Sequence, residues 1–337
     1  MGYKIGSFNV RNLSVKKKRE TLDYIVQIIK KEHFDIVALQ EVLDRGKILD
    51  GGMGRKVQGE TLLYEQSLLG RLPGYKMRWG ASNVKNKAKE DNGDKRGEGY
   101  AFLWNTKRIE LAKQIIPSGE SVFNPRIWGQ YSLKRADGVQ RLVRDPFYGR
   151  FKIKGMRQEI RLITTHIYFG SNNATDIDLR KRELNILAGA IYPRLHDKTY
   201  GVNTPATTIL LGDYNLNLKD SHAGSSYMNA VITVDENGMV RSGLDIQSDR
   251  NVRSFTTVQS QLSTLSSTGT EEKYSNNYDH FTYETSVGGI HRAHDGDSMS
   301  YPHVIKVCDL PVDIDFETYR KYVSDHLPIC VELTFRE

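Results

Sequence analysis

Polar residues with catalytic potential recur where apolar runs begin or end. Asp213 and Asn215 follow the apolar run of "TTILLGDYN", and similar positions recur along the chain. Taken alone, each such residue is more commonly a cap or turn residue, because Asp and Asn favour turns. Clefts form where loops meet at strand ends, so the whole series predicts one shared site. The series is Asn9, Glu41, Glu98, His166, Asp213, Asn215, Asp279, Asp325 and His326.

These residue types suit the hydrolysis of a phosphodiester. Carboxylate and amide oxygens without cysteine favour Mg²⁺, with Mn²⁺ or Ca²⁺ as alternatives, over zinc. Such an ion neutralises a phosphate oxygen and the charge that develops on a leaving group. Histidine moves protons near neutral pH when a carboxylate orients it. The residue types therefore predict metal-assisted phosphodiester hydrolysis.

The elements that must position these residues are two sheets with helices outside. Apolar residues at helical spacing predict helices over 15–34 and 176–195, and 60–72 also has a helical pattern. Segment 105–147 is expected to be irregular, 82–97 a charged loop, and the Ser- and Thr-rich 255–276 a loop. Some strands follow one another directly while others are separated by helices, which favours two packed sheets in an α/β domain. Strands are expected at 3–8, 34–42, 75–81, 99–105, 148–155, 158–170, 207–213, 278–285 and 326–335.

The composition narrows the class of protein. The 337 residues are 38% hydrophobic, which is enough for one large core or two modest ones. No apolar run approaches the roughly 20 residues of a membrane span. The start lacks the apolar region of a signal peptide, so we expect a cytoplasmic protein or one secreted after processing. We also expect a monomer. The net charge of +7 suits a polyanion, either nucleic acid or an anionic membrane. Two free buried thiols are expected at Cys308 and Cys330 in preference to one disulfide.

Five segments carry a family resemblance. "GSFNV", "IVALQEV", "TTHIYFG", "LLGDYNLN" and "SDHLPICVEL" resemble, in order, the endonuclease/exonuclease/phosphatase superfamily. The resemblance implies an α/β (α+β) fold, a four-layer α/β/β/α sandwich of two mixed β-sheets flanked by helices. It implies one domain over 1–337, with basic loop insertions near 82–97 and 105–147. It also implies a divalent-metal phosphoesterase, in which Asp213 and Asn215 match the catalytic Asp-x-Asn of the family.

Within that superfamily, the chain resembles the deoxyribonuclease I branch. The resemblance rests on His166 and on the segments "EGYAFLW" and "RDPFYGRF". It implies that Glu98 orients His166 as the general acid. It implies that Asp279 orients His326 as the general base, although the two roles could be exchanged. The alternative for each histidine is a simple hydrogen bond to a phosphate oxygen.

The remaining site residues are predicted to hold metal or substrate. Glu41 is expected to be the principal metal ligand, helped by Asp325, Asn9 or Asp213. The residues expected to bind substrate are Arg144, Asn215, Asn9, Arg96 and Arg126. By resemblance Arg144 contacts the substrate phosphate, and the alternative is a solvated surface arginine. The chain departs from the pancreatic-type enzyme at Leu43, where that enzyme has arginine, and at Arg96, where it has a tyrosine that stacks in the groove.

The leading prediction is therefore a deoxyribonuclease of low sequence specificity that acts on DNA as an endonuclease, with RNA as an alternative substrate. A sphingomyelinase or phosphoinositide phosphatase is the second hypothesis. Such an enzyme needs an apolar loop or hairpin to enter the membrane interface, and only residues 127–131 are candidates for it. A non-catalytic binding scaffold is the third hypothesis. The complete set of polar residues at the strand ends argues against it.

Overall fold

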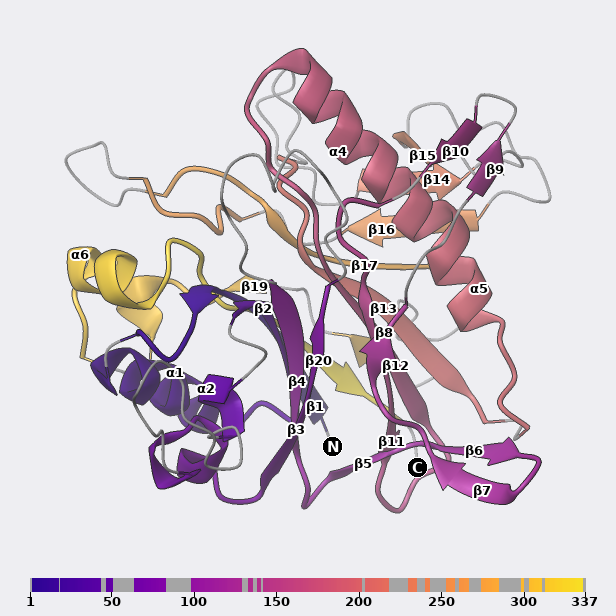
Figure 1. Cartoon of the computed structure of the whole chain (residues 1–337), viewed down its shortest axis with the longest axis horizontal. Coiled ribbons are helices and arrows are strands. Elements are labelled where there is room, and N and C mark those ends of the chain that lie inside the picture. Colours follow the sequence, from indigo (N-terminus) through magenta and orange to yellow (C-terminus); the bar gives the residue numbers. More distant parts are fainter. Residues whose placement is uncertain are drawn as a thin grey trace.

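Two β-sheets pack face to face, with helices on their outer faces (Figure 1). The computed structural model describes residues 2–17, 19–43, 47–50, 64–82, 98–128, 133–135, 138–140, 142–201, 204–217, 230–234, 240–242, 253–257, 261–266, 274–284, 298–299, 303–310 and 313–335. This architecture confirms the four-layer sandwich of mixed sheets expected from the sequence. None of the helices in these ranges is both long and apolar enough to cross a membrane.

The first sheet has β1 at its centre. Its order is β18 (Ser298–Met299), β20 (Ile329–Thr334), β1 (Gly2–Leu13), β2 (Ile36–Val42), β4 (Gly99–Asn105) and β3 (Tyr75–Ala81), and β19 (His303–Val304) also pairs with β20. The β1–β2 pair is parallel, and the other described pairs of this sheet are antiparallel. Strands β2 and β4 are almost fully buried, as expected for inner strands covered on both faces.

The second sheet places β12 beside β13. Its order is β15 (Val240–Ser242), β14 (Ala230–Val234), β16 (Arg253–Thr257), β17 (Asp279–Glu284), β13 (Ala206–Asp213), β12 (Glu159–His166), β11 (Phe147–Ile153) and β5 (Ile109–Leu111), and β8 (Arg126–Ile127) also pairs with β11. The β12–β13 pair is parallel, so the carboxyl ends of both strands lie at the same edge of the sheet. Two separate hairpins complete the strands: β6 (Lys113–Ile116) with β7 (Gly119–Val122), and β9 (Leu133–Arg135) with β10 (Gly138–Gln140).

Helices cover the two outer faces. Helix α1 (Arg19–Lys31) buries Leu22, Ile25, Val26 and Ile29, which recur at helical spacing within the helix expected over 15–34. On the second sheet, α4 (Ala174–Ile186) continues through a π-helical turn, Leu187–Ile191, into α5 (Tyr192–His196). Pro193 explains the wider turn, because proline lacks the N–H for a regular helical bond. The shorter helices are α2 (Lys47–Asp50), α6 (Phe316–Thr318), the π-helical turn Tyr319–Val323, and 3₁₀ turns at Tyr64–Gln66, Leu69–Arg71 and Val307–Asp309.

Alternation along β12 and β13 directs the side chains of His166 and Asp213 into the space between the sheets. Ile209 and Leu211 belong to the core shared by the two sheets, whereas Leu210 packs under α4 and α5. Successive strand residues point to opposite faces, so Asp213 points the same way as Leu211. His166 follows the same rule from Leu162 on β12. Two polar strand ends are thereby directed toward the first sheet.

Several expected elements differ in the structure. Segment 105–147 was expected to be irregular, but it holds the short strands β5 to β10. Strands of two to four residues are too short to show alternation in a sequence. The described part of 60–72 forms 3₁₀ turns instead of a helix, because Pro73 and Gly74 end the run. Strand β16 occupies the start of the expected 255–276 loop. Residues 83–97, which include Arg96, lie outside the described residues.

The cysteines correct one expectation and agree with another. Both thiols are free, but Cys308 is exposed where it was expected to be buried. Cys308 lies in the 3₁₀ turn that follows β19, so no strand or helix packs it into the core. Cys330 is fully buried in β20. Burial raises the pKa of the Cys330 thiol to about 12, so this thiol stays protonated.

Candidate active site

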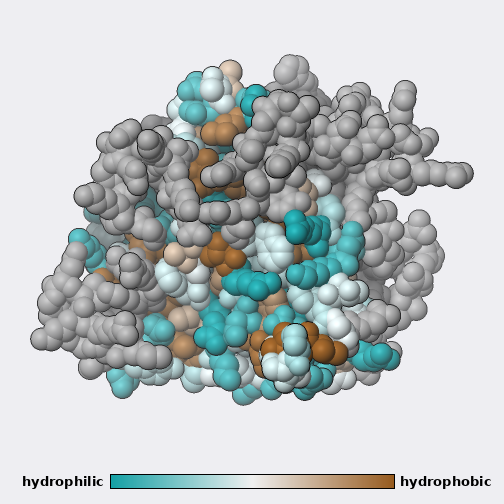
Figure 2. All heavy atoms as spheres, turned by 45° about the vertical axis from the view of Figure 1, so that its right-hand side comes forward, coloured by the Kyte–Doolittle hydropathy of each residue, from teal (hydrophilic) through white to brown (hydrophobic). Residues whose placement is uncertain are grey.

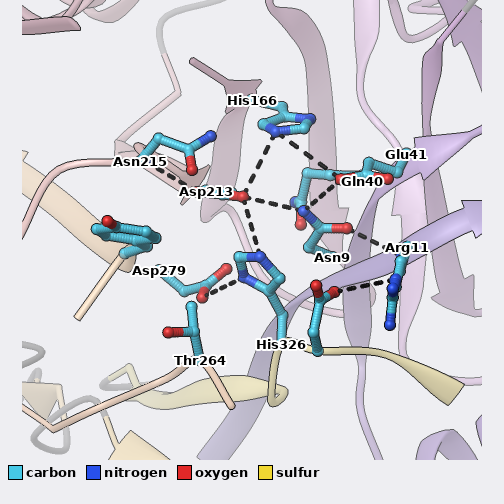
Figure 3. A network of polar contacts seen from close by, with 12 residues as sticks. Asn9, Arg11, Gln40, Glu41, His166, Asp213, Asn215, Thr264, Asp279 and His326 are labelled. Atoms are coloured by element: carbon cyan, nitrogen blue, oxygen red, sulfur yellow. Dashed lines mark hydrogen bonds and ion pairs between the residues drawn. The ribbon is translucent and has the colours of Figure 1, made fainter. Parts of the chain in front are cut away.

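The candidate active site lies where strand ends of the two sheets meet (Figure 3). Asn9 and Glu41 come from β1 and β2 of the first sheet, and His326 lies three residues before the start of β20. His166 and Asp213 end β12 and β13, where they are paired in register. The Nδ2 atom of Asn9 donates to Asp213 Oδ2 at 2.9 Å, which joins the two sheets at the site. The structure therefore gathers residues that are far apart in the sequence.

Two histidines face each other across one carboxylate oxygen. His326 Nδ1 lies 2.9 Å from Asp279 Oδ2, and His166 Nδ1 is hydrogen-bonded to Glu98 Oε1. The Nε2 atom of each histidine lies 3.5 Å from the same atom, Asp213 Oδ2. Each ring therefore has one nitrogen held by a carboxylate and the other directed at Asp213. This is the arrangement that proton transfer on both sides of a substrate requires.

A further layer of contacts holds the two orienting carboxylates. The Ser263 hydroxyl donates to Asp279 Oδ2 at 2.7 Å. The Arg144 guanidinium lies 2.7 Å from Glu98 Oε2 through Nη2, and its Nη1 donates to the His166 carbonyl at 3.2 Å. Arg144 is 5% exposed, so it is not a solvated surface arginine. Its contacts make it a residue that positions the His166–Glu98 pair.

The environment of both histidines favours the protonated ring. Burial alone would lower the pKa of His326, but Asp279 and Asp213 outweigh it and raise that pKa well above its ordinary value. Burial and the positive charge of Arg144 lower the pKa of His166, while Glu98 and Asp213 raise it, and the net direction is upward. For the carboxyl of Asp213 burial acts in the opposite direction and raises the pKa, although the two histidines lower it. The carboxylates around each ring therefore stabilise the proton that a base gains or that an acid holds before transfer.

A bulge at the end of β2 turns Glu41 into the site. Gln40 already points between the sheets, because its Nε2 donates to Thr164 Oγ1 of β12 at 2.9 Å. In a regular strand the next side chain would point to the opposite face. Glu41 instead has φ of 59°, and the pairing of β2 with β4 shifts register between Leu39 and Val42. Such backbone strain persists where surrounding contacts fix it, as they commonly do at functional sites.

A second strained turn fixes Asp213 and Asn215. Gly212 has φ of 134°, and a Cβ there would lie 2.0 Å from the Thr165 carbonyl oxygen. Only glycine suits that position. Asn215 has φ of 50°, its backbone N–H donates to Asp213 Oδ1 at 2.8 Å, and its Nδ2 donates to the Ile167 carbonyl at 2.7 Å. One amide hydrogen of Asn215 Nδ2 is thus engaged, which leaves the other for a ligand.

Hard oxygen ligands border the histidines. Asn9 Nδ2 donates to Glu41 Oε1 at 3.1 Å, and the Asn12 backbone N–H donates to Glu41 Oε2 at 2.9 Å. The carboxylates of Glu41 and Asp325 are 18% and 37% exposed, so solvent reaches both. Two cations lie near them. Arg11 Nε is 3.6 Å from Asp325 Oδ1, and Lys17 interacts electrostatically with the negative charges of both Glu41 and Asp325. The donor set fits a divalent cation that prefers oxygen.

A second group of possible ligands overlaps the His326 pair. Asp213, Asp279 and His326 bring one donor atom each within 4.8 Å of one another. The hydrogen bond between His326 Nδ1 and Asp279 already occupies two of these residues, and Nε2 of His326 faces Asp213. That geometry suits a proton-transfer pair more closely than a metal centre.

The structure brings together all but two of the predicted site residues. Arg126 lies on β8, exposed, and makes no described contact with the cluster. Arg96 lies outside the described residues. Four supporting residues were not predicted: Tyr100, Glu183, Ser263 and Arg11. Of these four, Arg11 had a sequence signal, since it is a charged residue two positions after Asn9. The other three are ordinary members of a strand, helix or loop and carried no such signal.

Comparisons with known proteins bear on the family and the fold of the chain. Residues 6–290 match the Endonuclease/Exonuclease/phosphatase family model. Among solved structures, D. rerio TDP2 complexed with single strand DNA product has a TM-score of 0.52 at 15% identity, with 99% of each chain covered. An endonuclease/exonuclease/phosphatase family protein from Bacteroides thetaiotaomicron has a TM-score of 0.50 at 16% identity, with 100% of this chain and 99% of that chain covered. No curated protein sequence matches the chain.

The two structural likenesses show the shared sandwich fold. The family match spans most of the chain, and it includes the segments that carry Asn9, Glu41, His166, Asp213 and Asp279. Those segments are the ones whose ends converge in the site. This chain therefore belongs to the Endonuclease/Exonuclease/phosphatase family and is a hydrolase of phosphoester bonds.

Proposed function

We propose that the protein is a divalent-metal-dependent phosphodiesterase that cleaves DNA as an endonuclease of low sequence specificity. The observation that carries this proposal is the pair of histidines whose Nε2 atoms both lie 3.5 Å from Asp213 Oδ2. A phosphodiester needs a proton removed from the attacking water and a proton delivered to the leaving oxygen. Two oriented histidines on opposite sides of one position can perform both transfers.

We assign the base role to His326 and the acid role to His166. His326 takes one proton from water as the water oxygen bonds to phosphorus. His166 gives one proton to the departing 3′ oxygen as the P–O bond breaks, so the total number of protons on the pair is unchanged. Asp279 and Glu98 hold the Nδ1 sides and stabilise the charged rings. The free N–H of Asn215 would donate to a non-bridging phosphate oxygen.

Glu41, Asp325 and the Asn9 side chain would hold a Mg²⁺ or Mn²⁺ ion. When bound, the ion would supply charge neutralisation at the phosphate and the leaving group. Glu41 is the principal ligand in this proposal, because the bulge at φ of 59° directs its carboxylate into the site. Asn9 would keep Glu41 and Asp213 at a fixed separation, since its Nδ2 donates to both.

Charge and likeness support nucleic acid as the substrate. The net charge of +7 favours a polyanion. The TDP2 likeness is to a complex with single strand DNA product, which makes DNA a reasonable first substrate to test, although at 15% identity it shows only the fold. RNA is the alternative nucleic acid.

A phospholipid substrate is the second candidate, because the structure contains an exposed hairpin with apolar side chains. In the β6–β7 hairpin, Ile115 is 54% exposed and Val122 is 50% exposed. Lys113 and Glu120 form an ion pair at 2.8 Å between these two residues, on the same face of the hairpin. Entry of that face into hydrocarbon would dehydrate the ion pair. This hypothesis therefore stands second to the nuclease.

One experiment separates these functions. The protein is incubated with supercoiled plasmid, single-stranded DNA, RNA, and vesicles that contain sphingomyelin or a phosphoinositide. Each substrate is tested with Mg²⁺, Mn²⁺ or EDTA, and the His326→Ala variant is the matched control. We expect plasmid nicking that needs the metal and is lost in the variant. Hydrolysis of lipid without cleavage of any nucleic acid would overturn the proposal.

A further inference from the structure

We propose that a surface centred on Trp128 binds a single-stranded segment of the nucleic-acid substrate by stacking one base on the indole ring. The surface, called here the Trp128 patch, consists of Arg126, Trp128 and Lys198. It lies on the outer face of the second sheet, beside the end of α5. Its link to catalysis rests on the nuclease proposed above, but its binding is a separate property.

The indole ring is held in place and partly open. Trp128 is half-buried, and its backbone N–H donates to the Pro146 carbonyl at 2.8 Å. Its ring packs edge-on against Tyr148, with centroids 5.9 Å apart and an interplanar angle of 81°. Arg126 and Lys198, both exposed, lie over the ring at 5.5 Å and 5.3 Å from its centroid. A fixed aromatic ring flanked by cations is the usual platform for single-stranded nucleic acid.

The two exposed cations over this ring have no carboxylate partner among the residues that the structure describes. Neither Arg126 nor Lys198 forms an ion pair with any carboxylate of the described ranges. Burial lowers the pKa of Lys198, and the charged groups that lower it further are all arginines: Arg126, Arg194 and Arg150. Arg150 is 2% exposed and is neutralised by Glu159, whose carboxylate accepts from its Nε at 2.8 Å, so the excess charge of the patch comes from Arg126 and Lys198. Such an excess of positive charge is costly by itself and becomes favourable when a polyanion arrives.

A base can compete with the cations for the ring. Stacking of a base on an aromatic side chain is stronger than an exposed cation–π contact. Arg126 and Lys198 are long and exposed, so either can leave the ring and pair with a phosphate of the same strand. Stacking and phosphate contact would therefore occur together, without readout of the base sequence.

The patch lies within reach of the candidate active site. Ile127 is paired with Phe147 of β11, and Phe147 is paired with Thr164 of β12, two residues before His166. Two strand spacings place Trp128 about 10 Å from the end of β12. Because the patch faces outward and the histidines point between the sheets, a bound strand must pass around the end of the sheet, which takes at least about three nucleotides at the ~3.4 Å rise of a stacked strand. The side of the molecule that Figure 2 turns forward carries a band of hydrophilic side chains above a small hydrophobic cluster.

An anionic membrane is the competing partner for a basic and aromatic surface. The neighbouring hairpin is joined to the patch, since the Ile115 N–H donates to the Tyr200 carbonyl at 3.1 Å. Its exposed face carries the Lys113–Glu120 ion pair, which opposes insertion into lipid. Nucleic acid is therefore the partner that these contacts favour.

Binding to a short fluorescein-labelled oligothymidylate in EDTA, measured by anisotropy, tests the proposal. The same backbone made of abasic residues is the second ligand. We expect Trp128→Ala to weaken oligothymidylate binding about tenfold or more and to leave abasic binding unchanged, while Trp128→Phe keeps most of the affinity. Arg126→Gln with Lys198→Gln should weaken both ligands and reduce the salt slope by ~1.4. Lys154→Gln with Arg157→Gln, at the exposed β11–β12 turn, is the charge-matched control and should change neither.

Each other outcome overturns the proposal. Oligothymidylate binding that is unchanged in folded Trp128→Ala and Trp128→Phe would refute stacking, and equal effects of the two charge pairs would refute the patch. If the patch variants lose binding to phosphatidylserine vesicles but keep oligothymidylate binding, the surface is assigned to membranes. Circular dichroism checks folding. Binding is measured in EDTA, which prevents turnover, so it is independent of the cleavage assay with metal. Binding that depends on Trp128, without cleavage of any nucleic acid in that assay, would refute only the nuclease. Cleavage together with binding that does not depend on Trp128 would refute only the patch.

Discussion

A buried carboxylate behind the site should make the stability of this protein depend on pH. Glu183, on α4, accepts a hydrogen bond from the Val143 N–H at 2.9 Å and thereby holds the chain next to Arg144. Burial raises the pKa of Glu183 to about 7, although the amides of Val143 and Tyr168 and the positive charges of Arg144 and His166 lower it. The proposed change is Glu183→Gln, which keeps the shape and an acceptor but cannot ionise.

The sign follows from where the proton is bound. Below pH 4.5, the ordinary pKa of glutamate, the carboxyl is protonated in both the folded and the unfolded chain, and burial carries no penalty. Between pH 4.5 and about 7 the unfolded chain ionises while the folded chain keeps its proton, so the free energy of unfolding falls as pH rises. At ~1.36 kcal/mol for each pKa unit, the loss is about 3 kcal/mol by the time pH exceeds the folded pKa. The glutamine variant should not show this loss.

Urea unfolding of both proteins across this pH range measures the effect. The stability of Glu183→Gln relative to the parent should increase by about 3 kcal/mol from below pH 4.5 to above pH 7. Asp178→Asn is the matched control on the same helix, where the exposed carboxylate pairs with Arg182 at 2.7 Å. An exposed pair of this kind contributes little to stability. If the curves of Glu183→Gln and the parent run parallel across the range, the inference about Glu183 is wrong.

Three further predictions concern the site itself. Glu41→Ala should abolish turnover and weaken Mg²⁺ binding in calorimetry while the circular dichroism spectrum stays unchanged, and near-normal turnover would remove Glu41 as principal ligand. His166→Ala and His326→Ala should each lower kcat by at least ~100-fold, and a substrate with a better leaving group should rescue only His166→Ala; rescue of only the other variant would exchange the two roles. Gly212→Ala places a Cβ 2.0 Å from the Thr165 carbonyl and should lower the thermal midpoint, so an unchanged midpoint would contradict the strained turn.

The sequence located strands β12 and β13 because alternation and apolar runs are local signals. Both strands begin within one residue of the expected position, but β12 ends at His166 where residue 170 was expected. Alternation along the observed strands then places His166 and Asp213 between the sheets. The pairing of Asp279 with His326 came from the family resemblance, and the structure gives that pair a distance of 2.9 Å. These parts needed only strand positions and the order of the segments.

Other features depend on contacts that no local pattern encodes. The positive φ of Glu41 breaks the alternation that a sequence reading relies on, so its direction is visible only in the fold. Arg144 could not be separated from a surface arginine until Glu98 was found 2.7 Å away. Glu183 lies in a helix with ordinary polar spacing, and its burial depends on the loop that packs over it.

The bond between Asn9 and Asp213 has a consequence for folding kinetics. The two residues are 204 positions apart and lie on different sheets. Closing so long a loop is entropically costly, so this contact should form late, when the two sheets dock. Recovery of activity during refolding would then lag behind recovery of secondary structure, and enzyme activity would report the docking of the two sheets.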